Sequence, residues 1–262
     1  MKNKNLNFLK KNGYVVLKNI FTKQQCKCLK DLCVKVNEEK YKRKIKKPKN
    51  SKHKLNSHKQ DEIVYNLQNK DYKFIQAASN KKVLSIVTDY FNFGAFKKEY
   101  AILNQLTGRS PRSNSGAQTL HLDSRVPGLN FPIKIVATLM LEKFSFKNGA
   151  TRLLPKSHII QRFPKKTDNR NKSIKYINGS VGDVLIMNGS LWHGGSKNFT
   201  RNTRWSILIT YVRWFLKQSF DMPSSLPNRI KKKCNKNQLK LLGLYSMPPK
   251  NEYVRINALE DV

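Results

Sequence analysis

The first third of the chain combines one short apolar run with segments of helical spacing. Tyr14–Leu17 is aromatic and β-branched and follows a glycine, which predicts a first strand. Apolar residues recur every three or four positions from residue 22 to 37, and Thr22 with Gln25 has the form of a helix capping box. The same spacing returns at residues 71–78 and 81–91. The pattern therefore predicts a strand followed by three helices.

From about residue 99 helical spacing gives way to short apolar runs that alternate with turn residues. Pairs such as Asn148-Gly149 and Asn188-Gly189 favour tight turns between these runs. Many short strands at this spacing predict a mainly β fold, a jelly-roll (cupin-like) double-stranded β-helix core with flanking N-terminal helices. We expect its strands at residues 100–106, 118–123, 133–142, 151–154, 174–177, 184–187 and 205–215.

Two segments depart from this pattern. Residues 40–59 are dominated by lysine, and we interpret them as a solvated insertion in preference to a dedicated nucleic-acid patch. The tail from about residue 218 looks irregular, with one short helix expected at residues 236–244. The whole chain, residues 1–262, has a length that a single β-rich domain commonly reaches, so one domain is predicted.

Composition adds an extreme charge to this picture. The chain has 52 Lys and Arg against 16 Asp and Glu, a formal net charge of +36. Such a surface attracts polyanions, including nucleic acid, anionic lipid and phosphorylated metabolites. The lysines are spread along the whole chain, however, so charge alone names no partner.

The cysteines and the apolar segments bear on the compartment. Cys26 and Cys33 fall on one face of the helix expected at 22–37, which favours buried thiols, and no Cys-x-x-Cys pair indicates a zinc site. The N-terminus lacks the apolar stretch of a secretory signal, and no run approaches the roughly twenty apolar residues of a membrane span. These features predict a soluble cytoplasmic protein.

The chemistry begins with the triplet His121-Leu122-Asp123. Residues i and i+2 of a strand project to the same side, so His121 and Asp123 can reach one metal ion. His193 follows a turn-rich segment and can complete a set of two histidines and one carboxylate, which holds one face of Fe(II) and leaves other positions open. By contrast, His53 and His58 lie in the lysine-rich segment and are expected to be solvated, and His158 is interpreted as a structural residue or one that supports a ligand without binding the metal.

A second group lies eleven residues beyond His193. Arg204 precedes an apolar strand, where an arginine fork can bind a carboxylate through two hydrogen bonds. Ser206, two positions further, can face the same carboxylate. An organic diacid held by Arg204 and Ser206 would place its other end on the metal.

These motifs together resemble the phytanoyl-CoA dioxygenase-like branch of the Fe(II)/2-oxoglutarate-dependent oxygenases. The similarity covers most of the chain apart from the basic insertion and the tail, and the order of the motifs is specific. The matching segments are Gly-Tyr-Val-Val-Leu at 13–17, Gln-Thr-Leu-His-Leu-Asp at 118–123, Asn-Gly-Ala-Thr-Arg-Leu-Leu-Pro-Lys-Ser-His at 148–158, Gly-Asp-Val-Leu-Ile at 182–186, Leu-Trp-His-Gly at 191–194, Asn198 and Arg-Trp-Ser at 204–206.

The resemblance implies iron on His121, Asp123 and His193, with Arg204 and Ser206 on the distal carboxylate of 2-oxoglutarate. By position, Gln105 and Gln118 are further candidate contacts to this co-substrate, on either side of a loop expected at residues 107–117. The implied reaction consumes O2, converts 2-oxoglutarate to succinate and carbon dioxide, and hydroxylates the substrate. Family members that halogenate carry a small residue at the carboxylate position, so Asp123 favours hydroxylation.

Three functions follow from these observations. The first is a hydroxylase of a small organic substrate, with an anionic one favoured by the positive field. The second is the same chemistry on a nucleic acid or protein recruited by the basic surface. The third is a non-catalytic β-barrel binding protein, which the complete ligand set disfavours.

Overall fold

The computed structural model describes residues 2–42, 61–93, 95, 99–129, 131–249 and 251–252. Its central feature is a six-stranded sheet in which every neighbouring pair is antiparallel. In spatial order its strands are β1 (Tyr14–Leu17), β7 (Val184–Asn188), β4 (Lys134–Met140), β9 (Ser206–Arg213), β3 (Ala101–Pro111) and β2 (Asp61–Val64).

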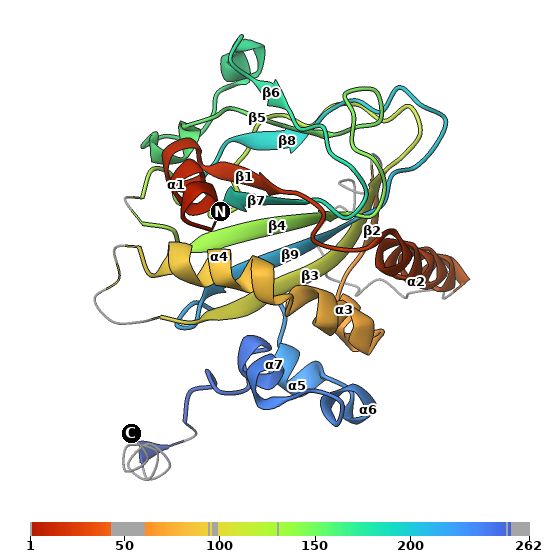
Figure 1. The fold of residues 1–262 in the computed structure, drawn as a ribbon, viewed down its shortest axis with the longest axis vertical. Helices are drawn as coiled ribbons and strands as arrows, with labels where there is room; N and C mark the ends of the chain where they lie inside the picture. The colour runs from red at the N-terminus through yellow and green to blue at the C-terminus, as the bar shows by residue number, and fades with distance from the viewer. Residues whose placement is uncertain are drawn as a thin grey trace, which may run out of the picture.

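A second, three-stranded sheet lies above one face of the large sheet (Figure 1). It consists of β6 (Lys175–Tyr176), β5 (Thr151–Leu153) and β8 (His193–Gly195), again antiparallel. Two facing antiparallel sheets are the arrangement of a jelly roll. The fold class expected from the sequence is therefore confirmed.

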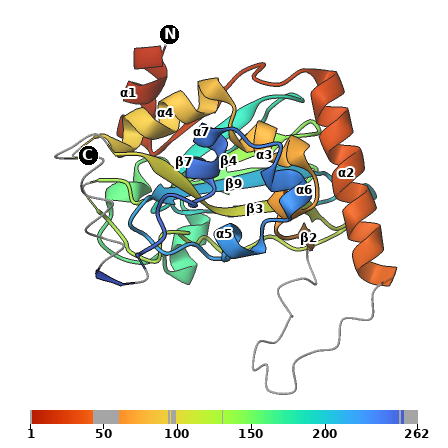
Figure 2. The same cartoon turned by 90° about the horizontal axis from the view of Figure 1, so that it is seen from below.

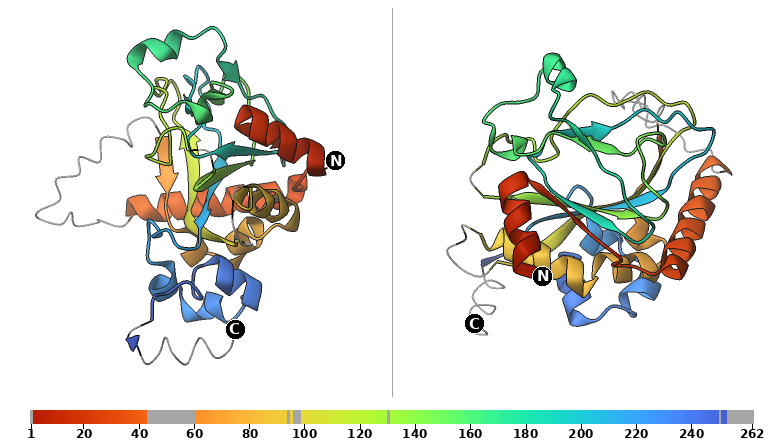
Figure 3. Two further views of the ribbon diagram at one scale, coloured as in Figure 1. Left: turned by 90° about the vertical axis from the view of Figure 1, so that its left-hand side faces the viewer. Right: turned by 45° about the horizontal axis from the view of Figure 1, so that its top comes forward.

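Helices cover the opposite face of the large sheet. Figure 2 shows α3, α4 and α7 in front of β4, β9 and β3, and the right panel of Figure 3 shows the C-terminal helices on the same side, away from the small sheet. The helices are α1 (Lys2–Asn12), α2 (Lys23–Lys42), α3 (Tyr72–Ala78), α4 (Lys81–Phe91), α5 (Met222–Ser225), α6 (Asn228–Lys231) and α7 (Lys236–Leu241), with short 3-10 turns η2 (Leu67–Asn69), η3 (Ser157–Ile159) and η4 (Lys166–Arg170).

Two main apolar cores follow from this layering, beside a small third cluster of Leu120, Leu122, Leu154 and Trp192. The larger core lies between the large sheet and the helices and includes Phe74, Val87 and Leu106. The smaller core lies between the two sheets and includes Met140 and Leu153. Because the smaller core fills only part of the space between the sheets, the rest of that space is free to form a cavity.

The strand β3 forms one wall of that space and contains a β-bulge. Its pairing with β9 shifts between Leu103 and Gln105, so Asn104 is an extra residue. Leu103 and Leu106 both belong to the helix-facing core, although they are three positions apart. As a result Gln105, and with it every second residue after it, faces the cavity between the sheets.

Several expected elements are confirmed. The strand at Tyr14–Leu17 and the helix at Lys81–Phe91 have the predicted bounds. In the capping box the Thr22 hydroxyl accepts from the Gln25 amide, and the Gln25 side chain accepts from the Thr22 amide. Cys26 and Cys33 are free and buried, as expected.

Other expectations were wrong. Residues 118–123 are not a strand, because their only ladder contact is a single bridge between His121 and His193. Residues 107–111, expected in a loop, continue β3. The helix α1 and the strand β2 were not predicted, and the described residues after 217 contain three short helices rather than one.

Two further expectations concern the lysine-rich segment and membrane-spanning helices. In the predicted insertion at 40–59, residues 40–42 end α2, and the remainder lies outside the described residues. No helix in the described ranges has the length and apolar character needed to cross a membrane.

Candidate active site

A cavity of about 690 Å³ lies between the two sheets. Its floor comes from β2, β3, β9 and β4 of the large sheet, and its roof from β8 and the segment that precedes β4. The ionisable residues that line it are Asp61, Arg109, His121, Asp123, Arg125, Lys134, His193 and Arg204. All three predicted metal ligands and the predicted arginine therefore face one cavity.

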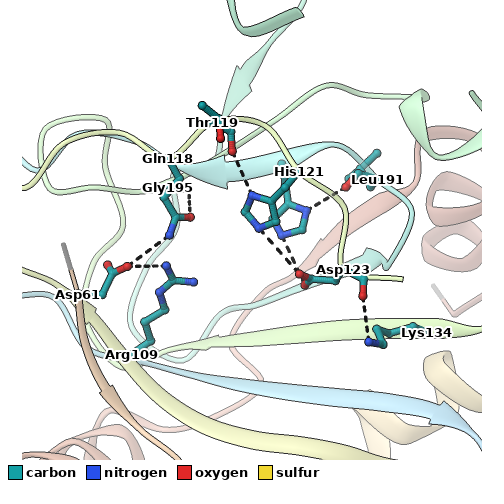
Figure 4. Close-up of polar contacts among 10 residues, drawn as sticks. Asp61, Arg109, Gln118, Thr119, His121, Asp123, Lys134, Leu191 and Gly195 are labelled. Atoms are coloured by element: carbon teal, nitrogen blue, oxygen red, sulfur yellow. Dashed lines mark hydrogen bonds and ion pairs between the residues drawn. The ribbon is translucent and has the colours of Figure 1, made fainter. Parts of the chain in front are cut away.

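His121 and Asp123 point toward one another in this cavity (Figure 4), and His193 completes the cluster. One ligand atom from each residue lies within 4.8 Å of the others. The Asp123 carboxylate is 3.8 Å from Nε2 of His121 and 3.6 Å from Nε2 of His193. Two imidazoles and one carboxylate at this separation can bind a single divalent ion.

The backbone orients both histidines for this role. Nδ1 of His121 donates to the Thr119 carbonyl at 3.1 Å, and Nδ1 of His193 donates to the Leu191 carbonyl at 2.9 Å. The two residues also exchange backbone hydrogen bonds, each 2.9 Å long. Because the carbonyls occupy Nδ1, each ring presents Nε2 to the metal site.

Asp123 is held by a turn instead of a strand. Its amide donates to the Gly189 carbonyl at 2.7 Å, and its own carbonyl accepts from Nζ of Lys134 at 2.9 Å. The expectation of a regular strand here was wrong, yet the carboxylate still points toward the two histidines. Contacts to β4 and to the turn after β7 therefore replace the missing strand ladder.

The electrostatics of the cluster favour neutral imidazole. Burial, followed by the neighbouring His193, lowers the pKa of His121 to about 4, although the Asp123 carboxylate and the Thr119 carbonyl act in the opposite direction. A neutral imidazole is the form that binds a metal, so His121 needs no deprotonation at neutral pH.

Arg204 occupies the far end of the cavity. Its guanidinium stacks on the Phe144 ring at 3.6 Å, Nε donates to the Asn148 carbonyl at 3.2 Å and Nη2 donates to the Gly149 carbonyl at 3.0 Å. Nη1 is buried without a partner among the described residues. A buried, charged donor of this kind is costly unless a ligand accepts from it.

The other predicted contacts to a diacid also line the cavity, but two of them already have partners. The Ser206 hydroxyl donates to the Arg109 carbonyl at 3.1 Å. The Gln118 side chain donates to Asp61 at 3.3 Å and accepts from the Gly195 amide at 2.9 Å. Gln105 lines the cavity from β3.

A polar bridge that closes one side of the cavity was not predicted from the sequence. Arg109 on β3 forms an ion pair with Asp61 on β2, and Asp61 accepts from Gln118, which reaches Gly195 on β8 (Figure 4). The bridge thus joins the large sheet to the small one. Arg109 was assigned to a loop and β2 was not predicted, so only recognition of both strands could have placed these residues together.

The fold and this cavity define a class. Two facing antiparallel sheets with a histidine, aspartate and histidine cluster between them are the architecture of the jelly-roll oxygenases. The sequence profile of the phytanoyl-CoA dioxygenase (PhyH) family matches residues 9–206. The chain belongs to this family, and the predicted family and enzyme class are confirmed.

Curated relatives are distant. The chain is 26% identical over 106 residues to the uncharacterized protein Rv1501 of Mycobacterium tuberculosis, a match that covers 40% of this chain and 38% of the relative. It is 23% identical over 172 residues to the dioxygenase himG of Aspergillus japonicus, covering 57% and 52% respectively. The matches thus span about half of these relatives or less.

Solved structures resemble the fold over a greater length. HygX from Streptomyces hygroscopicus, solved with nickel, 2-oxoglutarate and hygromycin B, gives a TM-score of 0.64 at 15% identity and covers 83% of this chain and 90% of its own. AviO1 from Streptomyces viridochromogenes gives 0.62 at 14% identity, covering 81% and 95%. SnoN, a non-haem α-ketoglutarate-dependent epimerase from nogalamycin biosynthesis, gives 0.62 at 12% identity, covering 82% and 83%.

Proposed function

We propose that the chain is an Fe(II)/2-oxoglutarate-dependent dioxygenase that hydroxylates a small, anionic organic substrate and releases succinate. The observation that carries the proposal is the pairing of two features in one cavity. His121, Asp123 and His193 bring three metal-binding atoms within 4.8 Å of one another. Arg204 presents an unpaired guanidinium nitrogen to the same cavity.

The residues present fit both the metal and the co-substrate. Two histidines and one carboxylate form the facial set that non-haem Fe(II) oxygenases use. The unpaired Nη1 of Arg204 fits the distal carboxylate of 2-oxoglutarate, because a charge-assisted hydrogen bond would remove the cost of burying that donor. Fe(II), 2-oxoglutarate and O2 together would supply the oxidation of a substrate C–H bond to C–OH.

The protein's own groups would prepare that site. The Thr119 and Leu191 carbonyls fix the histidine rings, and Lys134 fixes the Asp123 backbone. Phe144 covers one face of the Arg204 guanidinium and keeps water from it. Asp123 occupies the carboxylate position, which favours hydroxylation over halide transfer.

The cavity supports a small-molecule substrate. Its volume of about 690 Å³ is within the range of pockets that enclose drug-sized ligands. HygX, which shares the fold, has been solved with the small molecule hygromycin B. Four basic side chains against two acidic ones line the cavity, so an anionic substrate suits it best.

The test is spectroscopic. Purified protein with Fe(II) and 2-oxoglutarate under argon should develop a weak visible charge-transfer band. The band should be lost in His121→Ala and His193→Ala. It should be retained in the matched control His158→Gln, because the wild-type His158 ring donates to the Lys10 carbonyl outside the cavity. Absence of the band in the wild-type protein at saturating Fe(II) and 2-oxoglutarate would contradict the proposal.

A second measurement concerns the reaction type. A panel of small carboxylates, phosphonates and thioesters should contain compounds that stimulate succinate release, and mass spectrometry of the product should show one added oxygen atom. SnoN, which shares the fold, is an epimerase, and epimerisation leaves the mass of the substrate unchanged. A product of unchanged mass would therefore indicate epimerisation in place of hydroxylation.

A further inference from the structure

Two basic residues, Arg125 and Lys134, line the cavity beside Asp123. Arg125 has no role in the site described above, and Lys134 contributes there only through its bond to the Asp123 carbonyl. Lys134 lies at the start of β4, and Arg125 lies two residues after Asp123. In the part of the chain that the structure describes, neither side chain forms an ion pair. Both cations lie beside Asp123, because Lys134 donates to the Asp123 carbonyl and Arg125 follows Asp123 by two residues.

Lys134 has donors to spare. Its Nζ donates to the Asp123 carbonyl at 2.9 Å, and an ammonium group carries three N–H donors. Two donors are therefore free for a ligand beside the metal cluster.

The turn that carries Arg125 is firmly built. The amides of Asp123 and Ser124 both donate to the Gly189 carbonyl, at 2.7 and 2.9 Å. The hydroxyls of Ser124 and Ser190 both donate to the Val126 carbonyl, at 2.8 and 2.9 Å. Arg125 itself has φ 59°, a left-handed conformation that is costly for a side chain of this size. The surrounding hydrogen bonds hold this exposed residue at the cavity in spite of that cost.

The charges in the cavity separate into three groups. Asp61 neutralises Arg109 through their ion pair. A divalent ion, the Asp123 carboxylate, doubly charged 2-oxoglutarate and Arg204 carry no net charge together. Arg125 and Lys134 then remain as two uncompensated positive charges, on the side of the metal cluster where Asp123 lies.

We infer that Arg125 and Lys134 form the anion-binding subsite for the substrate and select a compound with a phosphonate, phosphate or carboxylate group. This inference rests on the proposed function, because the charge count assumes bound metal and 2-oxoglutarate. Two cations suit a dianion, so phosphonate or phosphate should bind more tightly than carboxylate. The anionic group would lie beside the metal cluster and fix which carbon of the substrate faces it.

The test uses the full-length protein loaded with Ni(II) and 2-oxoglutarate, the combination present in a HygX structure. Calorimetric titration with methylphosphonate and with acetate then measures anion binding without turnover. We expect saturable methylphosphonate binding that is tighter than acetate binding. Arg125→Gln should weaken it by up to about fivefold, the effect of losing one solvent-exposed charge pair.

Further variants distinguish binding at this subsite from nonspecific attraction to the positively charged protein surface. The double variant Arg125→Gln/Lys134→Gln should lose saturable methylphosphonate binding, whereas Lys134→Arg should retain it. Arg170→Gln removes one positive charge from an exposed residue of η4 that does not line the cavity, and it should leave the dissociation constant unchanged.

The outcomes are distinct. Wild-type protein that binds 2-oxoglutarate but not methylphosphonate or acetate would overturn the subsite and leave the proposed function standing. An Arg125→Gln variant with wild-type affinity for methylphosphonate would also overturn it. Wild-type protein that fails to bind 2-oxoglutarate would overturn the proposed function, and the subsite with it.

Discussion

Arg204 carries its positive charge in a buried position, where a charge without a partner destabilises the fold. Its side chain is almost completely enclosed, and burial lowers its pKa to about 9, helped by the positive charge of Arg109. The guanidinium therefore stays protonated at neutral pH. Two carbonyls and the Phe144 ring compensate part of the burial, and Nη1 is left to an external acceptor. This single unpaired atom is the strongest residue-scale sign of a co-substrate.

Substitution of Arg204 should act mainly on 2-oxoglutarate. Arg204→Ala should weaken its binding by about 2 to 5 kcal/mol, because it removes a buried charge-assisted pair. Arg204→Lys should recover only part of that loss, since an ammonium group lacks the planar fork that stacks on Phe144. Calorimetric titration of 2-oxoglutarate measures both effects. An unchanged dissociation constant in Arg204→Ala would remove Arg204 from the co-substrate site.

The ion pair between Asp61 and Arg109 should matter for stability. Asp61→Asn would leave the half-buried Arg109 guanidinium without a counter-charge beside Arg204, at a cost of about 1 to 3 kcal/mol. Urea unfolding would report it as a lower midpoint. Asp168→Asn breaks the Asp168 pair with Arg162 at the surface and should cost less. An equal loss of unfolding free energy in the two variants would show that the cavity ion pair contributes no more to stability than the surface pair.

At the scale of elements, α2 has a defined start. The reciprocal hydrogen bonds between Thr22 and Gln25 satisfy amides at its first turn. Thr22→Ala should destabilise the fold by about 1 kcal/mol, and Thr22→Ser should restore most of that. Chemical denaturation monitored by circular dichroism measures the change. A Thr22→Ala variant as stable as the wild type would show that packing of α2 alone fixes its start.

The sequence predicted best the elements whose signals are local. The cap of α2, the helix Lys81–Phe91 and the strand Tyr14–Leu17 all depend on neighbouring residues, and all were found. The alternation of β3 was harder to follow because Asn104 is an extra residue in its ladder. Strict alternation from Leu103, which faces the helices, would place Arg109 on the helix-facing side of β3 as well. Arg109 instead lines the cavity on the opposite side.

The candidate site shows the same division. Motif order was enough to predict that the three candidate metal ligands and Arg204 face one cavity, although the strand expected around His121 does not exist. The partners of the site residues depend on contacts between distant segments. Neither the bond from Lys134 to Asp123 nor the engagement of Gln118 by Asp61 has a local signal.

At the scale of the whole molecule, the net charge of +36 and the enclosed cavity should respond differently to salt. Binding of a labelled single-stranded oligonucleotide should weaken steeply as salt rises, because counterion release drives it. Binding of 2-oxoglutarate should change far less, since its proposed partner Arg204 is buried and poorly screened. Fluorescence anisotropy and calorimetry measure the two affinities. Oligonucleotide-stimulated succinate release that persists at high salt would instead favour a nucleic-acid substrate.

The bulge at Asn104 has a consequence for the C-terminal segment. The extra residue is the one position of β3 whose removal would leave every other side chain on its present face, because the strand would then pair regularly with β9. The contribution of Asn104 to the structure is therefore expected to come from the hydrogen bonds that it forms. Asn104 donates to the Lys217 carbonyl and accepts from both the amide and the hydroxyl of Ser219. Deleting this residue should preserve the β3 wall of the cavity and remove its bonds to Lys217 and Ser219. Gln218, which donates to the Leu103 carbonyl, and the buried Met222 and Leu241 would still hold the helices that follow. The expected effect is therefore a displaced Ser219 at the edge of the cavity, with the tail still attached to the sheet.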